Sequence, residues 1–202
     1  MNPLAQGWNN ANASTQPTYG VLPGPGYSQP ATTLANPPEL VRFVFTPSGP
    51  DGTIHNSVVT RISAGPTEPV FRITTNSTTH GYSVVQSGAY EKCAYVEWLA
   101  QATPMVEVYG IVSKRTTAAW LALSSRKSYR RMSARHYTFR WVPDESNINL
   151  SSDSASNPRF YGRISRAHGV TAVELTPEAL QLGLLEVAVV AALVILSGRN
   201  ID

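Results

Sequence analysis

The stretch of the sequence best suited to chemistry is strongly basic and runs from residue 114 to residue 140. It holds eight lysines and arginines and no acidic residue, whereas the whole 202-residue chain has a net charge of only +3. Clustered cations attract phosphate-rich partners, because an anionic membrane surface contributes about 1 kcal/mol per nearby Lys or Arg and a nucleic-acid backbone releases counterions. The alternative is a solvated strand face and loop that needs no ligand. The candidate residues for binding anionic lipid or phosphate are Lys114, Arg115, Arg126, Lys127, Arg130 and Arg131.

Motifs for catalysis and for metal binding are absent from the sequence. It contains no G-x-S-x-G elbow, no phosphate-binding P-loop and no H-E-x-x-H pair. Cys93 is the single cysteine, which excludes an intramolecular disulfide and every multi-cysteine metal site. The four histidines have no short metal-ligand spacing. We therefore expect a non-enzymatic protein with no catalytic residue, no cofactor and no metal.

The middle of the chain, from about residue 40 to residue 175, has the two-residue period of β-strands. In the clearest run, 136–141, Tyr137, Phe139 and Trp141 fall on one face of the strand and the polar residues fall on the other. Turn residues such as Gly, Pro, Asp and Ser separate the runs, which indicates an antiparallel barrel or sandwich. The other expected strands are 41–45, 57–62, 70–74, 93–99, 105–112, 159–164 and 171–175.

The C-terminal region predicts one helix over residues 177–197. Thr176 is suited to the N-cap and Pro177 to the first helical position, and Gly198 is a natural C-terminal stop. A helix of this length spans roughly 31 Å.

This helix must be surrounded by apolar material, because residues 187–196 include no polar side chain. Either lipid or protein could surround it. An uninterrupted run of ten residues is short for a membrane span, and Gln181 and Glu186 lie in the half that would have to enter hydrocarbon. We therefore favour burial in protein, with a tail-anchored membrane protein as the alternative.

The N-terminal segment 1–38 contains seven prolines and no charged side chain. It has few aliphatic residues to bury, so we expect a disordered arm, followed by one domain over 39–202. The arm lacks the positive and apolar regions of a signal peptide, which favours an intracellular location, in the cytoplasm or at the cytoplasmic face of a membrane.

The order of arm, short strands and apolar C-terminal helix resembles the Tubby C-terminal and LURP-one superfamily, to which the phospholipid scramblases belong. Within it, the chain is most similar to a family of unknown function from mushroom-forming fungi, the basidiomycetes. The resemblance covers about residues 39–200. It rests on residues 40–45, 95–98, 106–110, 120–121 and 137–141, and on the terminal helix.

This resemblance implies a closed antiparallel barrel of about twelve strands, wrapped around the C-terminal helix. Tubby-type domains bind phosphoinositide head groups through basic residues, which favours anionic phospholipid over nucleic acid as the partner. Tyr129 and Tyr137 could stack on bases and keep nucleic acid as a less favoured alternative. The chain lacks the cysteine cluster of scramblases, so we expect a lipid-binding or protein-interaction module, with a scramblase-like membrane protein as the alternative.

Overall fold

The computed structural model describes residues 39–49, 53–63, 67–75, 81–154 and 156–202. The arm predicted for residues 1–38 lies outside these described residues. Within them, thirteen strands form one antiparallel sheet. The strands are β1 (Val41–Pro47), β2 (Ser57–Ile62), β3 (Pro69–Thr75), β4 (Tyr82–Ser87), β5 (Lys92–Glu97), β6 (Met105–Val108), β7 (Val112–Thr116), β8 (Leu121–Leu123), β9 (Arg130–Ala134), β10 (Tyr137–Asp144), β11 (Asn147–Ser152), β12 (Phe160–Ala167) and β13 (Val170–Leu175).

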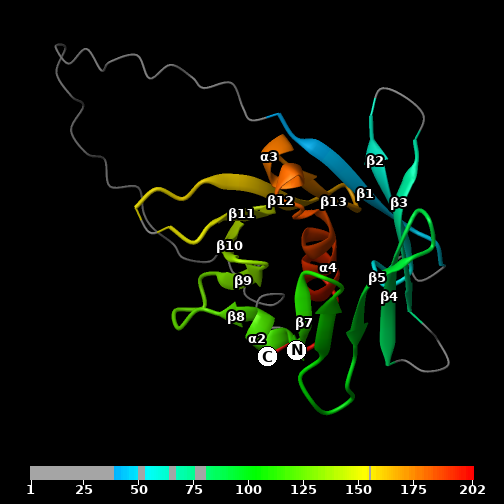
Figure 1. The fold of residues 1–202 in the computed structure, drawn as a ribbon, viewed down its shortest axis with the longest axis horizontal. Coiled ribbons are helices and arrows are strands. Elements are labelled where there is room, and N and C mark those ends of the chain that lie inside the picture. Colours follow the sequence, from blue (N-terminus) through cyan, green and yellow to red (C-terminus); the bar gives the residue numbers. More distant parts are fainter. Residues whose placement is uncertain (1–38, 50–52, 64–66, 76–80, 155) are drawn as a thin grey trace.

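The sheet starts from the pairing of its first and last strands. β1 pairs with β13, from Val41 opposite Leu175 to Phe45 opposite Thr171. From this pair the strands follow the chain outward on both sides, so that β7 and β8 become the two edges. The one-turn helix α2 (Thr117–Trp120) connects these edges, and Figure 1 shows the sheet curving so that both approach it. The structure thus has thirteen strands rather than about twelve, and the strand order shows no hydrogen-bonded closure between β7 and β8.

Alternating side chains on the strands build the interior. On β10, Phe139 and Trp141 are 2% and 1% exposed, as the two-residue period predicted, whereas Tyr137 at the start of the strand is exposed. The run 105–112 was expected as one strand and is two, because Tyr109 and Gly110 turn the chain between β6 and β7. Gly110 has φ +71°, a conformation that favours glycine.

The predicted helix 177–197 is interrupted, and the structure corrects it to two helices. They are α3 (Pro177–Gln181) and α4 (Leu185–Ile195). The Thr176 hydroxyl caps α3 by accepting a hydrogen bond from the Ala179 backbone N–H, as expected for an N-cap. Gly183 takes φ +69° between the helices, which ends α3 and redirects the chain.

The second helix, α4, forms the centre of the core. All nine residues from Val187 to Ile195 are buried. Figure 1 shows α4 inside the curve of the sheet, with strands on several sides. This burial explains why the sequence of α4 has no polar face. In the part of the chain that the structure describes, no helix is long and apolar enough to cross a membrane.

Candidate functional site

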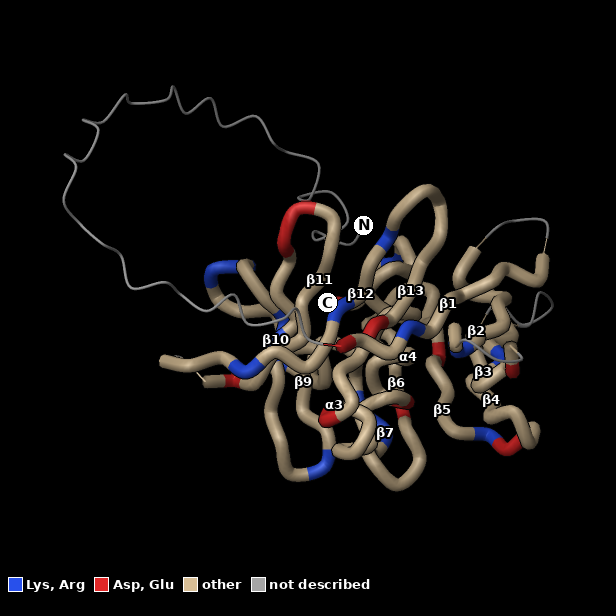
Figure 2. Tube along the Cα trace, turned by 90° about the horizontal axis from the view of Figure 1, so that it is seen from above, with Lys and Arg blue, Asp and Glu red and all other residues tan. Residues whose placement is uncertain are grey.

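The basic residues predicted as a ligand surface do not form one patch. Figure 2 shows Lys and Arg dispersed over several loops and strands, with Asp and Glu between them. Arg130 is the clearest correction, because its side chain is 0% exposed. It donates to both carboxylate oxygens of Asp202, at 2.8 and 2.6 Å, and to the Leu121 carbonyl at 2.8 Å. Arg130 therefore belongs to the interior and is unavailable to a ligand.

Two further candidates are paired with carboxylates on the outer face of the sheet. Arg131 lies opposite Arg140 in the β9–β10 ladder, and Asp153 forms ion pairs with both. The Arg131–Asp153 distance is 2.8 Å. Lys114 on β7 is 3.0 Å from Glu97 on β5. Hydrogen bonds from Lys114 lower the pKa of the Glu97 carboxyl, and the same contact raises the pKa of Lys114.

Three candidates remain exposed, and no ion pair to them is found within the described residues: Arg115, Arg126 and Lys127. Arg115 lies on the edge strand β7, where its guanidinium donates to the Ser113 hydroxyl at 2.8 Å. Arg126 and Lys127 are neighbours in the turn between β8 and β9, and Lys127 has φ +55°. Arg126 and Lys127 are therefore two adjacent exposed cations in one turn, whereas Arg115 lies on a different element, β7.

The chain after α4 is anchored at its far end. Ile201 is fully buried, and its carbonyl accepts a hydrogen bond of 2.8 Å from the Thr117 hydroxyl of α2. Asp202 binds Arg130 of β9. We call residues 198–202 the C-terminal tail; its contacts join α4 to α2 and β9, close to both edges of the sheet.

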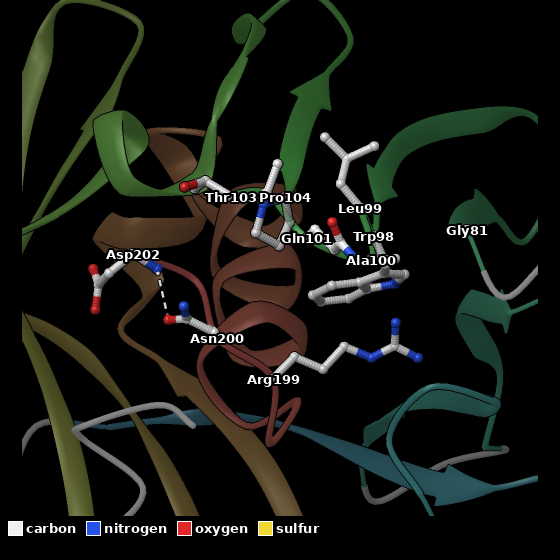
Figure 3. Close-up of a pocket in the computed structure, with 11 residues that line it drawn as sticks. Gly81, Trp98, Leu99, Ala100, Gln101, Thr103, Pro104, Arg199, Asn200 and Asp202 are labelled. Atoms are coloured by element: carbon white, nitrogen blue, oxygen red, sulfur yellow. Dashed lines mark hydrogen bonds between the residues drawn. The ribbon is translucent and has the colours of Figure 1, made fainter.

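A pocket of about 830 Å³ lies between this tail and the loop that connects β5 and β6. Figure 3 shows Arg199 extending beneath the Trp98 ring, with Asn200 and Asp202 further along the tail. No sequence pattern predicted this pocket, because its two walls are about a hundred residues apart in the chain. Its lining is Gly81, Trp98, Leu99, Ala100, Gln101, Ala102, Thr103, Pro104, Arg199, Asn200 and Asp202.

The indole of Trp98 is fixed on several sides. Its Nε1–H donates to the Ser83 hydroxyl at 2.8 Å. The His55 ring packs against it in a T-shaped arrangement, with 5.5 Å between the centroids and the rings nearly perpendicular. On another side, the Arg199 guanidinium lies 4.8 Å from the ring centroid, which is within cation–π range. Trp98 is therefore a rigid wall of the pocket that also positions Arg199.

Two titratable groups behind and beside this wall have shifted pKa values. Burial lowers the pKa of His55; a hydrogen bond to the Ser197 carbonyl opposes that shift, and the charge of Arg199 adds to it. The Nδ1 atom of His55 is buried and has no hydrogen-bond partner in the described structure. Burial also lowers the pKa of Arg199. Burial is thus the largest cause of both shifts.

The described part of the chain holds no cluster of metal ligands, and its one cysteine is partly buried. The described residues include no group of three His, Cys, Asp or Glu side chains that could hold a metal ion. Cys93 on β5 is half-buried, and burial, with the charge of Glu186, raises the pKa of its thiol. A raised pKa disfavours the nucleophilic thiolate, and Cys93 packs, partly buried, against the core.

Comparisons with known proteins leave the family open. No protein-family model matches the chain, and no curated protein matches it. Among solved structures, the chain is similar to an X-ray structure of a protein from Arabidopsis thaliana, with 14% sequence identity and a TM-score of 0.42, over 78% of this chain and 92% of that one.

Proposed function

We propose that this chain is a non-catalytic binding module that docks on anionic phospholipid surfaces containing phosphoinositides, at the cytoplasmic face of a membrane. The observation that supports it is the pair Arg126 and Lys127, which are exposed and adjacent in the β8–β9 turn. No carboxylate pairs with either side chain among the described residues. A turn can present both charges to a flat surface without moving a strand.

The strength of such docking follows from the number of available charges. Each cation near an anionic surface contributes about 1 kcal/mol. Arg126 and Lys127 together would supply about 2 kcal/mol, or roughly 30-fold in affinity. Lys114, Arg131 and Arg130 add little, because their charges are already matched by carboxylates. The proposed docking is therefore weak and reversible.

The resemblance to the Tubby, LURP-one and scramblase superfamily, and to its basidiomycete family, is part of the same proposal. The resemblance implies a closed antiparallel barrel around the C-terminal helix, and the antiparallel sheet with its buried C-terminal helix supports part of that arrangement. We propose a barrel-like enclosure in which α2 spans the gap between the edge strands β7 and β8. No hydrogen bonds pair β7 with β8 in the strand order of the sheet.

The alternatives are a protein-interaction domain and a tail-anchored or scramblase-like membrane protein. The second is the less favoured, because α4 has eleven residues and a length of about 16 Å, roughly half the thickness of the hydrocarbon core. Its buried residues also already contact strand side chains. The protein-interaction domain would be favoured if the chain failed to bind vesicles of every composition.

Co-sedimentation with vesicles tests the proposal. We expect the full chain to bind phosphatidylcholine vesicles that contain a phosphoinositide and not vesicles of phosphatidylcholine alone. The double variant Arg126→Glu/Lys127→Glu should bind about 30-fold more weakly or worse, from the loss of about 2 kcal/mol and added repulsion. Raising the salt concentration should weaken the wild type steeply, because the Debye length falls from about 10 Å at 0.1 M to about 3 Å at 1 M.

The matched control is Arg61→Glu/Arg72→Glu, which makes the same change in net charge on the exposed sides of β2 and β3. It should bind nearly as well as the wild type. If both double variants lose binding equally, the interaction reports net charge alone and the β8–β9 turn is not the docking site.

A further inference from the structure

Hydroxyl side chains that follow paired basic residues are candidate sites for protein kinases, because many kinases select their substrates by the pattern of charges around the hydroxyl. The sequence contains three pairs of adjacent basic residues, at positions 114–115, 126–127 and 130–131. Within the two positions after these pairs lie the hydroxyl groups of Thr116, Thr117, Ser128 and Ser133. The charge pattern does not separate these four candidates, whereas their places in the fold do.

Both threonines are already engaged in holding the fold. The Thr116 hydroxyl accepts a hydrogen bond of 3.3 Å from the Ala119 backbone N–H and caps α2. Thr117 is fully buried, and its hydroxyl donates to the Ile201 carbonyl at 2.8 Å. A kinase could reach either group only by disrupting α2, so neither threonine is a site in the folded chain.

Ser133 follows an arginine pair, but its backbone is held in the sheet. It lies in β9, which pairs with β8 on one side and with β10 on the other. Ser133 is opposite Thr138, and its carbonyl accepts a hydrogen bond of 3.0 Å from the Trp120 indole. The first arginine of its pair, Arg130, is fully buried. A kinase must take its substrate segment out of other pairings, and this strand cannot be released without breaking the sheet.

Ser128 is exposed in the β8–β9 turn, directly after Arg126 and Lys127. A different serine holds the turn, because the Ser124 hydroxyl accepts hydrogen bonds of 3.0 and 3.3 Å from the backbone N–H groups of Ser128 and Tyr129. No hydrogen bond to the Ser128 hydroxyl itself is found within the described residues. That hydroxyl is therefore accessible, and modifying it leaves the hydrogen bonds of the turn in place.

We infer that Ser128 is a phosphorylation site for a protein kinase that recognises basic residues, and that its phosphate releases the turn from anionic lipid. The Ser128 oxygen forms a bond to the γ-phosphorus of ATP, the hydroxyl proton passes to a base of the kinase, and ADP leaves. A phosphoserine carries about −1.5 to −2 charges at pH 7, which offsets the positive charges of Arg126 and Lys127. The release rests on the proposed docking function, whereas the assignment of Ser128 does not.

Phosphorylation of the full chain tests the assignment. The probes are the catalytic subunit of cyclic-AMP-dependent protein kinase and the catalytic fragment of protein kinase C, each with Mg²⁺ and ATP. Tandem mass spectrometry locates the phosphate, which we expect at Ser128 with at least one of the two kinases. Ser128→Ala should abolish its incorporation, whereas Ser125→Ala, at the exposed serine of the same turn, should not. Phosphate at Ser125 or Ser133 rather than at Ser128, or none with either kinase, would overturn the assignment.

Vesicle co-sedimentation tests the release. Chain phosphorylated at Ser128 should bind phosphatidylcholine vesicles that contain a phosphoinositide about 30-fold more weakly than the untreated chain. Kinase-treated Ser128→Ala is the matched control and should bind like the untreated wild type. Equal binding of the phosphorylated and untreated chains would overturn the release. If the untreated chain does not bind at all, the proposed function fails and the release fails with it, whereas the kinase assay still decides the assignment of Ser128.

Discussion

Arg130 and Asp202 form a two-point ion pair that joins the beginning of β9 to the C-terminal tail. The guanidinium is fully buried, whereas the Asp202 side chain retains 32% exposure. The Nε atom of Arg130 has no partner among the described residues, and the two hydrogen bonds to Asp202 and the one to Leu121 use three of the four terminal N–H groups. The tail is thereby tied to the strand next to an edge of the sheet.

Replacing Asp202 by alanine should be strongly destabilising. It leaves the buried charge of Arg130 without its carboxylate, and breaking a buried pair in this way typically costs about 3–5 kcal/mol. We expect a loss in the free energy of unfolding of about 3 kcal/mol, at the lower end of this range, because Asp202 is partly exposed. Urea denaturation monitored by circular dichroism measures the change.

The same measurement has two controls. Glu68→Ala removes one negative charge from the exposed surface and should change the free energy of unfolding by less than about 0.5 kcal/mol. Adding Arg130→Met to Asp202→Ala should recover much of the loss, because no buried charge remains. If Asp202→Ala alone is as stable as the wild type, the ion pair does not hold the tail in place.

The inward position of Arg130 shows both what the sequence could predict and what it could not. On β9, Arg130, Met132 and Ala134 are buried and alternate with exposed residues, so the two-residue period was present in the sequence. The basic charge of the stretch masked that period, since a buried arginine is rare without a partner. Its partner, Asp202, is 72 positions away, a separation that periodicity does not resolve.

Some other features of the fold were predicted from the sequence, and others were not. The burial of Val187–Ile195 followed from a run without polar residues, and the strand β10 from strict alternation over residues 136–141. The break at Gly183 was missed because apolar residues continue across it, although glycine is a frequent helix terminator. The pocket could not be predicted, because Trp98 and Arg199 are distant in the sequence and are brought into contact only by the tertiary structure.

Stability should depend on pH through His55. Burial lowers the pKa of His55 in the folded protein below the value of 6.5 for an unperturbed histidine. The unfolded chain therefore takes up the proton first as the pH falls. The contribution of neutral His55 to stability should be complete above about pH 6.5 and should be lost as the pH decreases from there toward the folded-state pKa.

The test compares the wild type with His55→Gln in urea at a pH above 7 and a pH between 5 and 6. The wild type should lose more stability than His55→Gln between the two conditions. His136→Gln is the matched control for the substitution itself, because His136 is exposed in the turn between β9 and β10. Parallel pH profiles for the wild type and His55→Gln would contradict this role of His55.

Gly162 on β12 should not tolerate a side chain. A Cβ atom at this position would collide with the carbonyl oxygen of Glu174 and with Leu175 on β13. Backbone on both strands would have to move, so Gly162→Ala should cost about 3 kcal/mol in the free energy of unfolding.

Gly110→Ala is the comparison, because Gly110 has a positive φ and open space around its Cβ position. It should cost only about 1 kcal/mol, from the backbone conformation alone. Equal losses would mean that β12 and β13 are further apart than described.

The most direct test of the central claim, that α4 is the core around which the sheet is built, is the stability of Val190→Asp. Val190 is fully buried, and a carboxylate there would have no partner in an apolar interior, at a cost of several kcal/mol. Gln181→Asp on the exposed side of α3 is the matched control and should remain folded. We predict that Val190→Asp abolishes the cooperative unfolding transition and the strand signal in circular dichroism. A Val190→Asp protein that unfolds cooperatively at the same urea concentration as Gln181→Asp would show that the sheet is stable without α4 in its interior, and would contradict the account.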